Sequence, residues 1–326
     1  MISPSEVNAR TLIAGLILTA VATTTPATAG ESDTALQPNV GAQFLTALDG
    51  TVVQVAGSAP NYRLMRRTGA GAFAPVPGAP EGLYRSVDLG HDGAGRLVLT
   101  YVRCSDERNC KAYSDDLAGH RVTYKHLAPK RCTLTSAPAR WGSRVTYGLT
   151  CTKPDGKAGV YDAKRSGLFV RAGRTAATLL RAPHGRHYVD RVDLRGTIVA
   201  AVTPGNQSYA FTQTVGAAHL RSMLITDNQG ETDNYSILGM ALGAGARVWT
   251  LVVDSEDEGS SVTEFIGRLG PNGCDREGMG VIVDPNTHVA TIPAASIAVD
   301  GDTPYLATSA GVVAHLFAPA TIECES

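Results

Sequence analysis

The stretch Arg131–Cys151, "RCTLTSAPARWGSRVTYGLTC", predicts a β-hairpin that is closed by a disulfide. Cys132 and Cys151 stand at equal distances from the Trp141–Gly142 pair at its centre. Residues that are equidistant from the turn of an antiparallel hairpin lie opposite each other. Glycine suits that turn because it adopts positive φ without a steric cost. The spacing therefore predicts a cross-strand bond between the two cysteines.

The same strand–glycine–strand form recurs along the chain. An extended run precedes and a β-rich run follows each of Gly50, Gly95, Gly142, Gly196, Gly245 and Gly301. Successive members of this set are 45, 47, 54, 49 and 56 residues apart. Repetition near this period, with further strand-like runs in each interval, is typical of the four-stranded blades of a β-propeller.

We therefore predict an all-β fold, a β-propeller with six blades. Seven blades are the alternative if the N-terminal segment and the long interval 142–196 hide another unit. A pair of β-sandwiches would also have short strands and frequent turns, but the recurrence favours the propeller.

The last unit has only three strand-like runs before the chain ends. A strand near Thr34–Val40 is predicted to complete it, which would remove an open sheet edge. The expected domains are a signal peptide at 1–29, an N-terminal segment at 30–42 and a single propeller at 43–326.

The N-terminus has the pattern of a secretory signal peptide. Arg10 precedes the apolar run Thr11–Ala22, and Ala27 and Ala29 form a small-residue cleavage site. No later stretch reaches membrane-spanning length, so the mature protein is expected to be secreted or periplasmic, without a membrane span.

Export permits disulfides in the mature protein. Besides the hairpin pair, Cys104 and Cys110 flank the turn "SDERN" and are predicted to bond. Cys274 and Cys324 remain, and their bond would join the fifth blade to the C-terminus. Free or metal-binding thiols are the alternative, but the chain has no C-x-x-C pair.

Composition excludes some classes of partner. The chain has 29 Lys+Arg against 30 Asp+Glu, a net charge of −1, which argues against binding to nucleic acid or to an anionic membrane surface. The sequence also lacks G-x-S-x-G, H-E-x-x-H and Gly-rich phosphate-loop motifs, so no catalytic residue is predicted.

Polar residues near predicted strand ends are candidates for the mouth of a propeller channel. They are His91, Asp92, His184, His187, Asp190 and Asp193. The last four also resemble a metal-ligand cluster, but a spacing of three aligns residues on a helix and not on a strand.

The loop "DSEDEGS" concentrates Asp254, Glu256, Asp257 and Glu258. Clustered carboxylates suit Ca²⁺, yet the EF-hand spacing is missing, so a solvated turn is the favoured interpretation. We expect no cofactor, with Ca²⁺ as the alternative.

Three runs resemble a known group of propellers. "VDLGHDGAGRLVLTYVRC" (Val87–Cys104), "YSDDLAGHRV" (Tyr113–Val122) and "VDLRGTIVAAV" (Val192–Val202) are similar to blades of exported bacterial TolB-like, WD-repeat-like proteins. The resemblance implies architecture and export, and no functional residue is carried over from it.

The sequence thus predicts an exported, non-catalytic propeller that binds or scaffolds a protein or a cell-envelope polymer. A propeller hydrolase or lyase acting on an extracellular polymer is one alternative. A structural component of an envelope assembly is the other.

Overall fold

The computed structural model describes residues 34–38, 42–105, 109–125, 127–153, 162–173, 175, 177–180, 188–203, 207–227, 233–256, 262–270, 273–281, 294–308, 311–317 and 320–322. Within these residues the chain forms β-sheets whose pairings are antiparallel apart from one parallel bridge between His91 and Trp141, with one 3-10 turn, η2 (Ala244–Ala246). No described helix is long and apolar enough to cross a membrane.

The strands follow one another through the sheets in chain order. One four-stranded sheet contains β2 (Ala42–Leu48), β3 (Thr51–Ala56), β4 (Arg63–Thr68) and β5 (Ala74–Pro75). A nine-stranded sheet begins with β6 (Leu83–His91), β7 (Leu97–Cys104), β8 (Cys110–Asp115) and β9 (Arg121–Thr123). Its other half contains β10 (Cys132–Leu134), β11 (Ala139–Trp141), β12 (Arg144–Cys151), β13 (Gly167–Ala172) and β14 (Thr178–Leu179).

Three further sheets complete the described fold. The first contains β15 (Arg191–Arg195), β16 (Ile198–Thr203), β17 (Gln207–Thr214) and β18 (Leu220–Asp227). The second contains β19 (Asp233–Leu242), β20 (Val248–Glu256), β21 (Val262–Gly270), β22 (Gly273–Val281) and β26 (Ala320–Ile322). The third contains β23 (Ala294–Asp300), β24 (Thr303–Thr308), β25 (Gly311–Ala314) and β1 (Thr34–Pro38).

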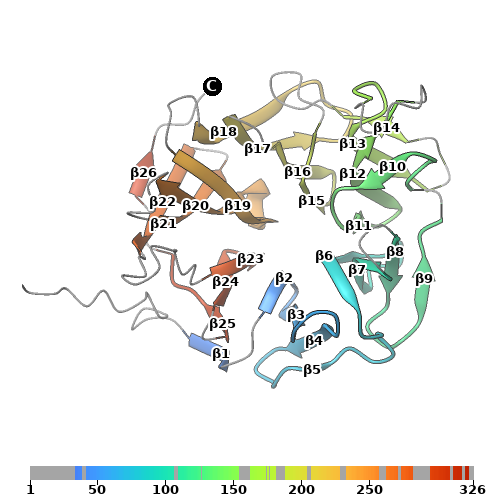
Figure 1. Cartoon of the computed structure of the whole chain (residues 1–326), viewed down its shortest axis with the longest axis horizontal. Coiled ribbons are helices and arrows are strands. Elements are labelled where there is room, and N and C mark those ends of the chain that lie inside the picture. The colour runs from blue at the N-terminus through green and yellow to red at the C-terminus, as the bar shows by residue number, and fades with distance from the viewer. Residues whose placement is uncertain are drawn as a thin grey trace, which may run out of the picture.

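The sheets surround a central axis, which confirms the propeller-like fold (Figure 1). Their innermost strands are β2, β6, β11, β15, β19 and β23, and each of these contacts the next, with β23 returning to β2. Apolar clusters fill the space between neighbouring sheets. One cluster, for example, joins Ala200 and Val202 on β16 to Val252 on β20 and Phe265 on β21.

All six predicted turn glycines lie between the first and second strands of a unit. Gly50, Gly95, Gly142, Gly196, Gly245 and Gly301 have φ values of 71°, 77°, 64°, 61°, 61° and 62°. These backbones occupy the left-handed region, which a residue with a Cβ adopts at a cost. The repeat therefore reflects a turn geometry that every unit shares.

Both chain ends add strands to sheets that are distant in sequence. β1 pairs with β25 and supplies the outer strand of the sheet that contains β23 and β24. β26 pairs with β22 at the outer edge of another sheet, where Ile322 lies opposite Cys274.

Two predicted disulfides are confirmed, Cys104–Cys110 and Cys132–Cys151. Both pairs are cross-strand partners in the sheet register. Cys274 is also disulfide-bonded. Its predicted partner Cys324 lies outside the described residues, so that pairing stays a prediction.

The hairpin that contains Cys132 differs from the expected continuous pair of strands. Its first strand is divided into β10 and β11, both of which pair with β12. Residues 135–138 lie between them and form no ladder with β12. Pro138 has no N–H to donate to such a ladder, which is consistent with the interruption.

Side-chain oxygens join the innermost strands of neighbouring sheets. Ser296 Oγ accepts the Leu45 N–H at 3.2 Å, and Thr46 Oγ1 accepts the Leu89 N–H at 2.8 Å. The carboxyl group of Asp88 accepts the backbone N–H of Arg140.

Asp193 has the same role on β15, where its Oδ2 accepts the Leu242 N–H at 2.7 Å. Buried N–H groups need partners, and these side chains supply them where two sheets meet without a continuous ladder.

The innermost strands of neighbouring units approach most closely at two glycines. A Cβ built on Gly90 of β6 would lie 1.8 Å from the carbonyl oxygen of Arg140 on β11. One built on Gly239 of β19 would lie 2.7 Å from the backbone nitrogen of Ile297 on β23. These positions tolerate no side chain unless the backbone moves.

Gly90→Ala should lower the free energy of unfolding by about 3 kcal/mol, because the new methyl group would push β6 away from β11. The matched control is Gly93→Ala, where nothing lies within 4 Å of the added Cβ. Urea unfolding of both variants measures the difference. Equal unfolding midpoints for the two variants would contradict the close approach of the strands.

Removing the disulfide that closes the longer loop should destabilise the fold more than removing the other. The paired cysteines are 19 residues apart in Cys132–Cys151 and 6 apart in Cys104–Cys110. Loop-closure entropy predicts losses of about 3 and about 2 kcal/mol for the two double Cys→Ala variants. Denaturant unfolding checks this order, and midpoints that match the parent protein would overturn it.

Candidate ligand-binding site

A cavity of ≈ 630 Å³ lies along the axis that the sheets surround. Its walls come from the innermost strands β2, β6, β15, β19 and β23, together with the segment between β10 and β11. Because one chain segment from each unit reaches this space, the site is assembled from residues far apart in sequence.

One wall carries side-chain oxygens that have no protein partner. Ser86 and Asp88 alternate along β6 and therefore share a face, while Thr135 and Thr150 come from the neighbouring hairpin. Ser86 Oγ, Asp88 Oδ2, Thr135 Oγ1 and Thr150 Oγ1 are buried atoms without a hydrogen-bond partner among the described residues. Such oxygens favour a bound group that donates hydrogen bonds.

The facing wall is charged. Arg191, Asp193 and Arg195 alternate along β15 and share one face. Asp193 is buried, and its two oxygens accept the N–H groups of Leu194 and Leu242 at 2.6 and 2.7 Å. Arg195 Nε lies 3.8 Å from Asp193 Oδ1. Asp193 is therefore held in place by the backbone of two strands.

Arg195 links two of the strands that line the cavity. Its Nη2 donates to the carbonyl oxygen of Ala47 at 3.0 Å and so joins β15 to β2 across the axis. Its guanidinium carbon lies 5.9 Å from the ring centre of Trp141. Arg195 directly precedes the turn glycine Gly196, so this link lies toward the end of the axis at which the turns lie.

The open end lies where the innermost strands begin. Tyr188 and Asp190 precede β15 in this region, and Tyr188 is 41% exposed. Arg191 donates from Nη2 to the carbonyl oxygen of Ile237 at 3.2 Å, and its Nε is 3.9 Å from Asp190 Oδ2. This mouth therefore offers an aromatic ring beside a guanidinium and a carboxylate.

Burial raises the pKa of Asp88 well above the usual value for a carboxyl group. The charge of Asp193 raises this pKa further, while Arg195 and the N–H groups of Arg140 and Leu89 oppose the increase. A carboxyl group with a raised pKa can donate as well as accept a hydrogen bond at moderately acidic pH.

Two of the predicted mouth residues, Asp190 and Asp193, line this cavity, whereas His91 and Asp92 do not. His91 Nε2 lies 2.7 Å from Asp49 Oδ2, and the His91 and Trp141 rings are 4.4 Å apart. Asp92 accepts hydrogen bonds within its own turn, where Arg96 lowers the pKa of this carboxyl to about 2. His91 thus ends β6, and Asp92 lies in the β6–β7 turn.

The remaining candidate residues are outside the described part of the chain. These are His184, His187, Asp257 and Glu258, and also the side chains of Asp254 and Glu256, whose backbones belong to β20. Among the described residues, no group of three or more His, Cys, Asp or Glu side chains could hold a metal ion. The Ca²⁺ alternative stays a prediction.

Ser86, Asp88 and Arg195 were not among the predicted site residues. A signal for Asp88 exists, because "VDL" occurs both at Val87–Leu89 and at Val192–Leu194, just before a turn glycine. The repeat could have paired Asp88 with Asp193.

No protein-family model matches the chain, and no curated protein matches it either. Among solved structures it is similar to a fucose-specific lectin from Aleuria aurantia, at 8% identity and a TM-score of 0.46, over 89% of this chain and 97% of the lectin. A mutant of AofleA from Arthrobotrys oligospora has 10% identity and a TM-score of 0.46, over 90% of this chain and 89% of that protein.

PorZ, a surface component of the type-IX secretion system of Porphyromonas gingivalis, has 11% identity and a TM-score of 0.44 over 90% of this chain. This chain spans only 39% of PorZ and 50% of a prolyl endopeptidase that is also similar. At these scores the likeness carries no inference about what this chain binds.

Asp88→Asn should stabilise the protein more at pH 8 than at pH 4. Because the native-state pKa of Asp88 is raised, the protein loses stability as pH rises through that pKa. The asparagine side chain does not ionise, so the variant avoids this loss. The control is Asp116→Asn, because the hydrogen bond from His120 lowers the pKa of Asp116 to about 2. Asp116→Asn should instead be less stable than the parent protein above the unfolded-state pKa of Asp116, and this difference should disappear as pH falls toward 2.

Melting temperatures of both variants between pH 2 and pH 8 provide the measurement. A stability difference between Asp88→Asn and the parent that stays constant from pH 4 to pH 8 would contradict the raised pKa.

Proposed function

We propose that the protein is an exported, non-catalytic binding protein, a six-bladed propeller that takes a hydroxyl-rich ligand, such as the end of a glycan, into its axial cavity. The TolB-like architecture and the cleaved signal peptide belong to the same proposal. The two confirmed disulfides are consistent with an extracellular or periplasmic location, since such bonds persist in oxidising compartments.

The observation that carries the proposal is the set of unpartnered oxygens on Ser86, Asp88, Thr135 and Thr150 in one wall of the cavity. Hydroxyl groups of a ligand can donate to these oxygens. They can also accept from the guanidinium groups of Arg85 and Arg191 at the open end. A polyhydroxylated ligand meets both requirements at once.

The cavity size and the aromatic side chains at its mouth agree with a small ligand or a chain end. A volume of ≈ 630 Å³ lies within the usual range of small-molecule sites. Tyr188 and Phe44 supply apolar surface near the entrance.

A hydrolase is the second candidate, because a carboxyl with a raised pKa beside a second carboxyl is an arrangement suited to acid–base catalysis. Asp193, however, has both oxygens occupied by backbone N–H groups. Asp88 likewise accepts the backbone N–H of Arg140 on β11. Their structural role favours binding over turnover.

An envelope assembly would be favoured by a large exposed apolar patch. The exposed large apolar side chains among the described residues are Val122, Leu179, Tyr188 and Leu316. Val122 and Leu179 lie on β9 and β14, at opposite edges of the nine-stranded sheet, and the other two lie in connections, so they do not support that alternative.

Isothermal titration of the mature protein with monosaccharides and oligosaccharides tests the proposal. The panel includes fucose, glucose, N-acetylglucosamine and cell-wall glycan fragments, with product analysis after overnight incubation. We expect saturable binding of at least one glycan without cleavage. Cleavage would establish the hydrolase instead, and a panel without binding would contradict the proposed ligand class.

Ser86→Ala and Thr150→Val should each weaken the binding of that glycan by about two- to tenfold, which corresponds to one lost hydrogen bond. Thr123→Val is the matched control, because Thr123 is exposed on β9 and does not line the cavity. Unchanged affinity in both cavity variants would place the glycan elsewhere on the protein.

A further inference from the structure

A second cavity lies away from the axis, between the β12–β13 pair and the segment Leu127–Cys132. Its volume is ≈ 500 Å³, and none of its described lining residues also lines the axial cavity. Any ligand of this cavity would therefore contact a separate set of side chains.

The floor of this outer pocket is apolar because of strand alternation. Tyr147 and Leu149 lie on one face of β12, and Phe169 lies directly opposite Tyr147 on β13. The two rings stack, with centroids 6.0 Å apart and an angle of 19° between their planes. Leu127 and Pro129 complete the apolar surface.

Cationic side chains line the rest of the pocket. Lys164, Arg165 and Arg171 contribute to its walls, and none of its described lining residues is acidic. Lys130 and Arg131 belong to the segment that borders it. In a chain with a net charge of −1, this is a local concentration of positive charge.

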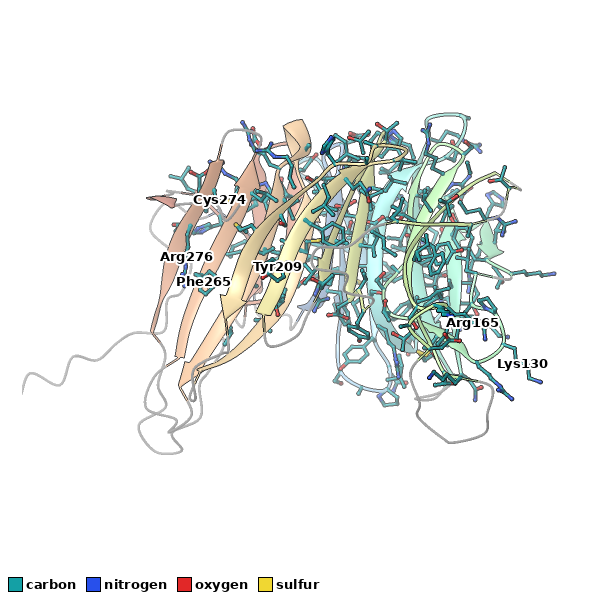
Figure 2. All side chains as sticks on the ribbon, turned by 90° about the horizontal axis from the view of Figure 1, so that it is seen from above. Lys130, Arg165, Tyr209, Phe265, Cys274 and Arg276 are labelled. Atoms are coloured by element: carbon teal, nitrogen blue, oxygen red, sulfur yellow. A yellow bond between two sulfur atoms is a disulfide. The ribbon has the colours of Figure 1, made fainter. Side chains whose placement is uncertain are left out.

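Two of these cationic side chains, those of Arg165 and Arg171, have a defined environment in the structure. Arg165 donates from Nη2 to the carbonyl oxygen of Lys130 at 3.1 Å, and Figure 2 shows the two residues side by side at one end of the molecule. Arg171 Nε is buried and has no hydrogen-bond partner among the described residues.

Arg171 also lies close enough to Tyr147 for its charge to act on the phenol. Burial raises the pKa of Tyr147, and the positive charge of Arg171 opposes that increase. A guanidinium that lines a pocket together with aromatic rings, and whose Nε–H has no partner among the described residues, is suited to hold an anionic group at the edge of an apolar surface.

We infer that the outer pocket binds a small anionic amphiphile, a carboxylate with an aromatic or aliphatic body. The apolar body covers Tyr147, Phe169 and Leu149. The carboxylate accepts hydrogen bonds from Arg171 and pairs with Lys164 or Arg165 at the rim.

Titration calorimetry with paired ligands tests this inference. The anionic probes are 3-phenylpropionate and octanoate, and the neutral counterparts are 3-phenylpropanamide and octanol. At least one carboxylate should bind, and its neutral counterpart should bind at least tenfold more weakly. The preferred carboxylate then distinguishes an aromatic from an aliphatic ligand.

Variants connect the binding to this pocket. Arg171→Gln should weaken carboxylate binding about tenfold, whereas Arg221→Gln, an exposed arginine on β18, should leave it unchanged. Lys164→Gln provides a second test at an exposed position that does not depend on the folding of the Arg171 variant. Its matched control is Lys111→Gln on β8, which does not line the pocket.

The inference is overturned if neither carboxylate binds at millimolar concentration or if the neutral compounds bind equally well. It is also overturned if Lys164→Gln and a folded Arg171→Gln retain the affinity of the parent protein.

Discussion

The fold depends on the close approach of innermost strands that belong to different repeat units. These strands meet without a continuous hydrogen-bond ladder, so backbone N–H groups at the junctions require other acceptors. Thr46, Asp88, Asp193 and Ser296 supply those acceptors from their side chains. Gly90 permits the tightest contact, in which β6 and β11 come near enough to form a single bridge between His91 and Trp141.

This constraint also determines the chemistry of the axial cavity. The side chains that join the sheets lie next to the axis, so the cavity wall becomes polar as a consequence of assembly. Both carboxylate oxygens of Asp193 accept backbone N–H groups. Asp88 Oδ2 and the nearby Ser86 Oγ on β6, in contrast, have no hydrogen-bond partner among the described residues. These unpartnered oxygens distinguish the proposed binding wall from the groups that only hold the units together, such as Arg195, which is bonded to Ala47.

Local and repeated features could be predicted from the sequence. The turn glycines recur once in each unit, and the Cys132–Cys151 pair is symmetric about the turn at one of them. Short-range geometry was therefore sufficient to predict the repeated turns and this disulfide. The division of the hairpin into β10 and β11 was missed because the equal spacing of the cysteines does not reveal residues that leave the ladder.

The candidate sites were harder to predict because they join residues that are far apart in sequence. Asp190 and Asp193 were named, yet His91 was grouped with them although it lies beside Asp49 in a turn. Proximity to a strand end does not tell which end of the axis a side chain occupies. The outer pocket depends on the register between β12 and β13, which places Tyr147 opposite Phe169. It also depends on the placement of Leu127–Cys132 beside these strands.

A crystal structure of the mature protein with a bound glycan tests the central claim most directly. The account predicts electron density for the glycan inside the axial cavity, with hydroxyl groups within hydrogen-bond distance of Ser86 Oγ and Asp88 Oδ2. Density confined to the outer faces of the sheets, with only solvent in the cavity at a saturating glycan concentration, would contradict it.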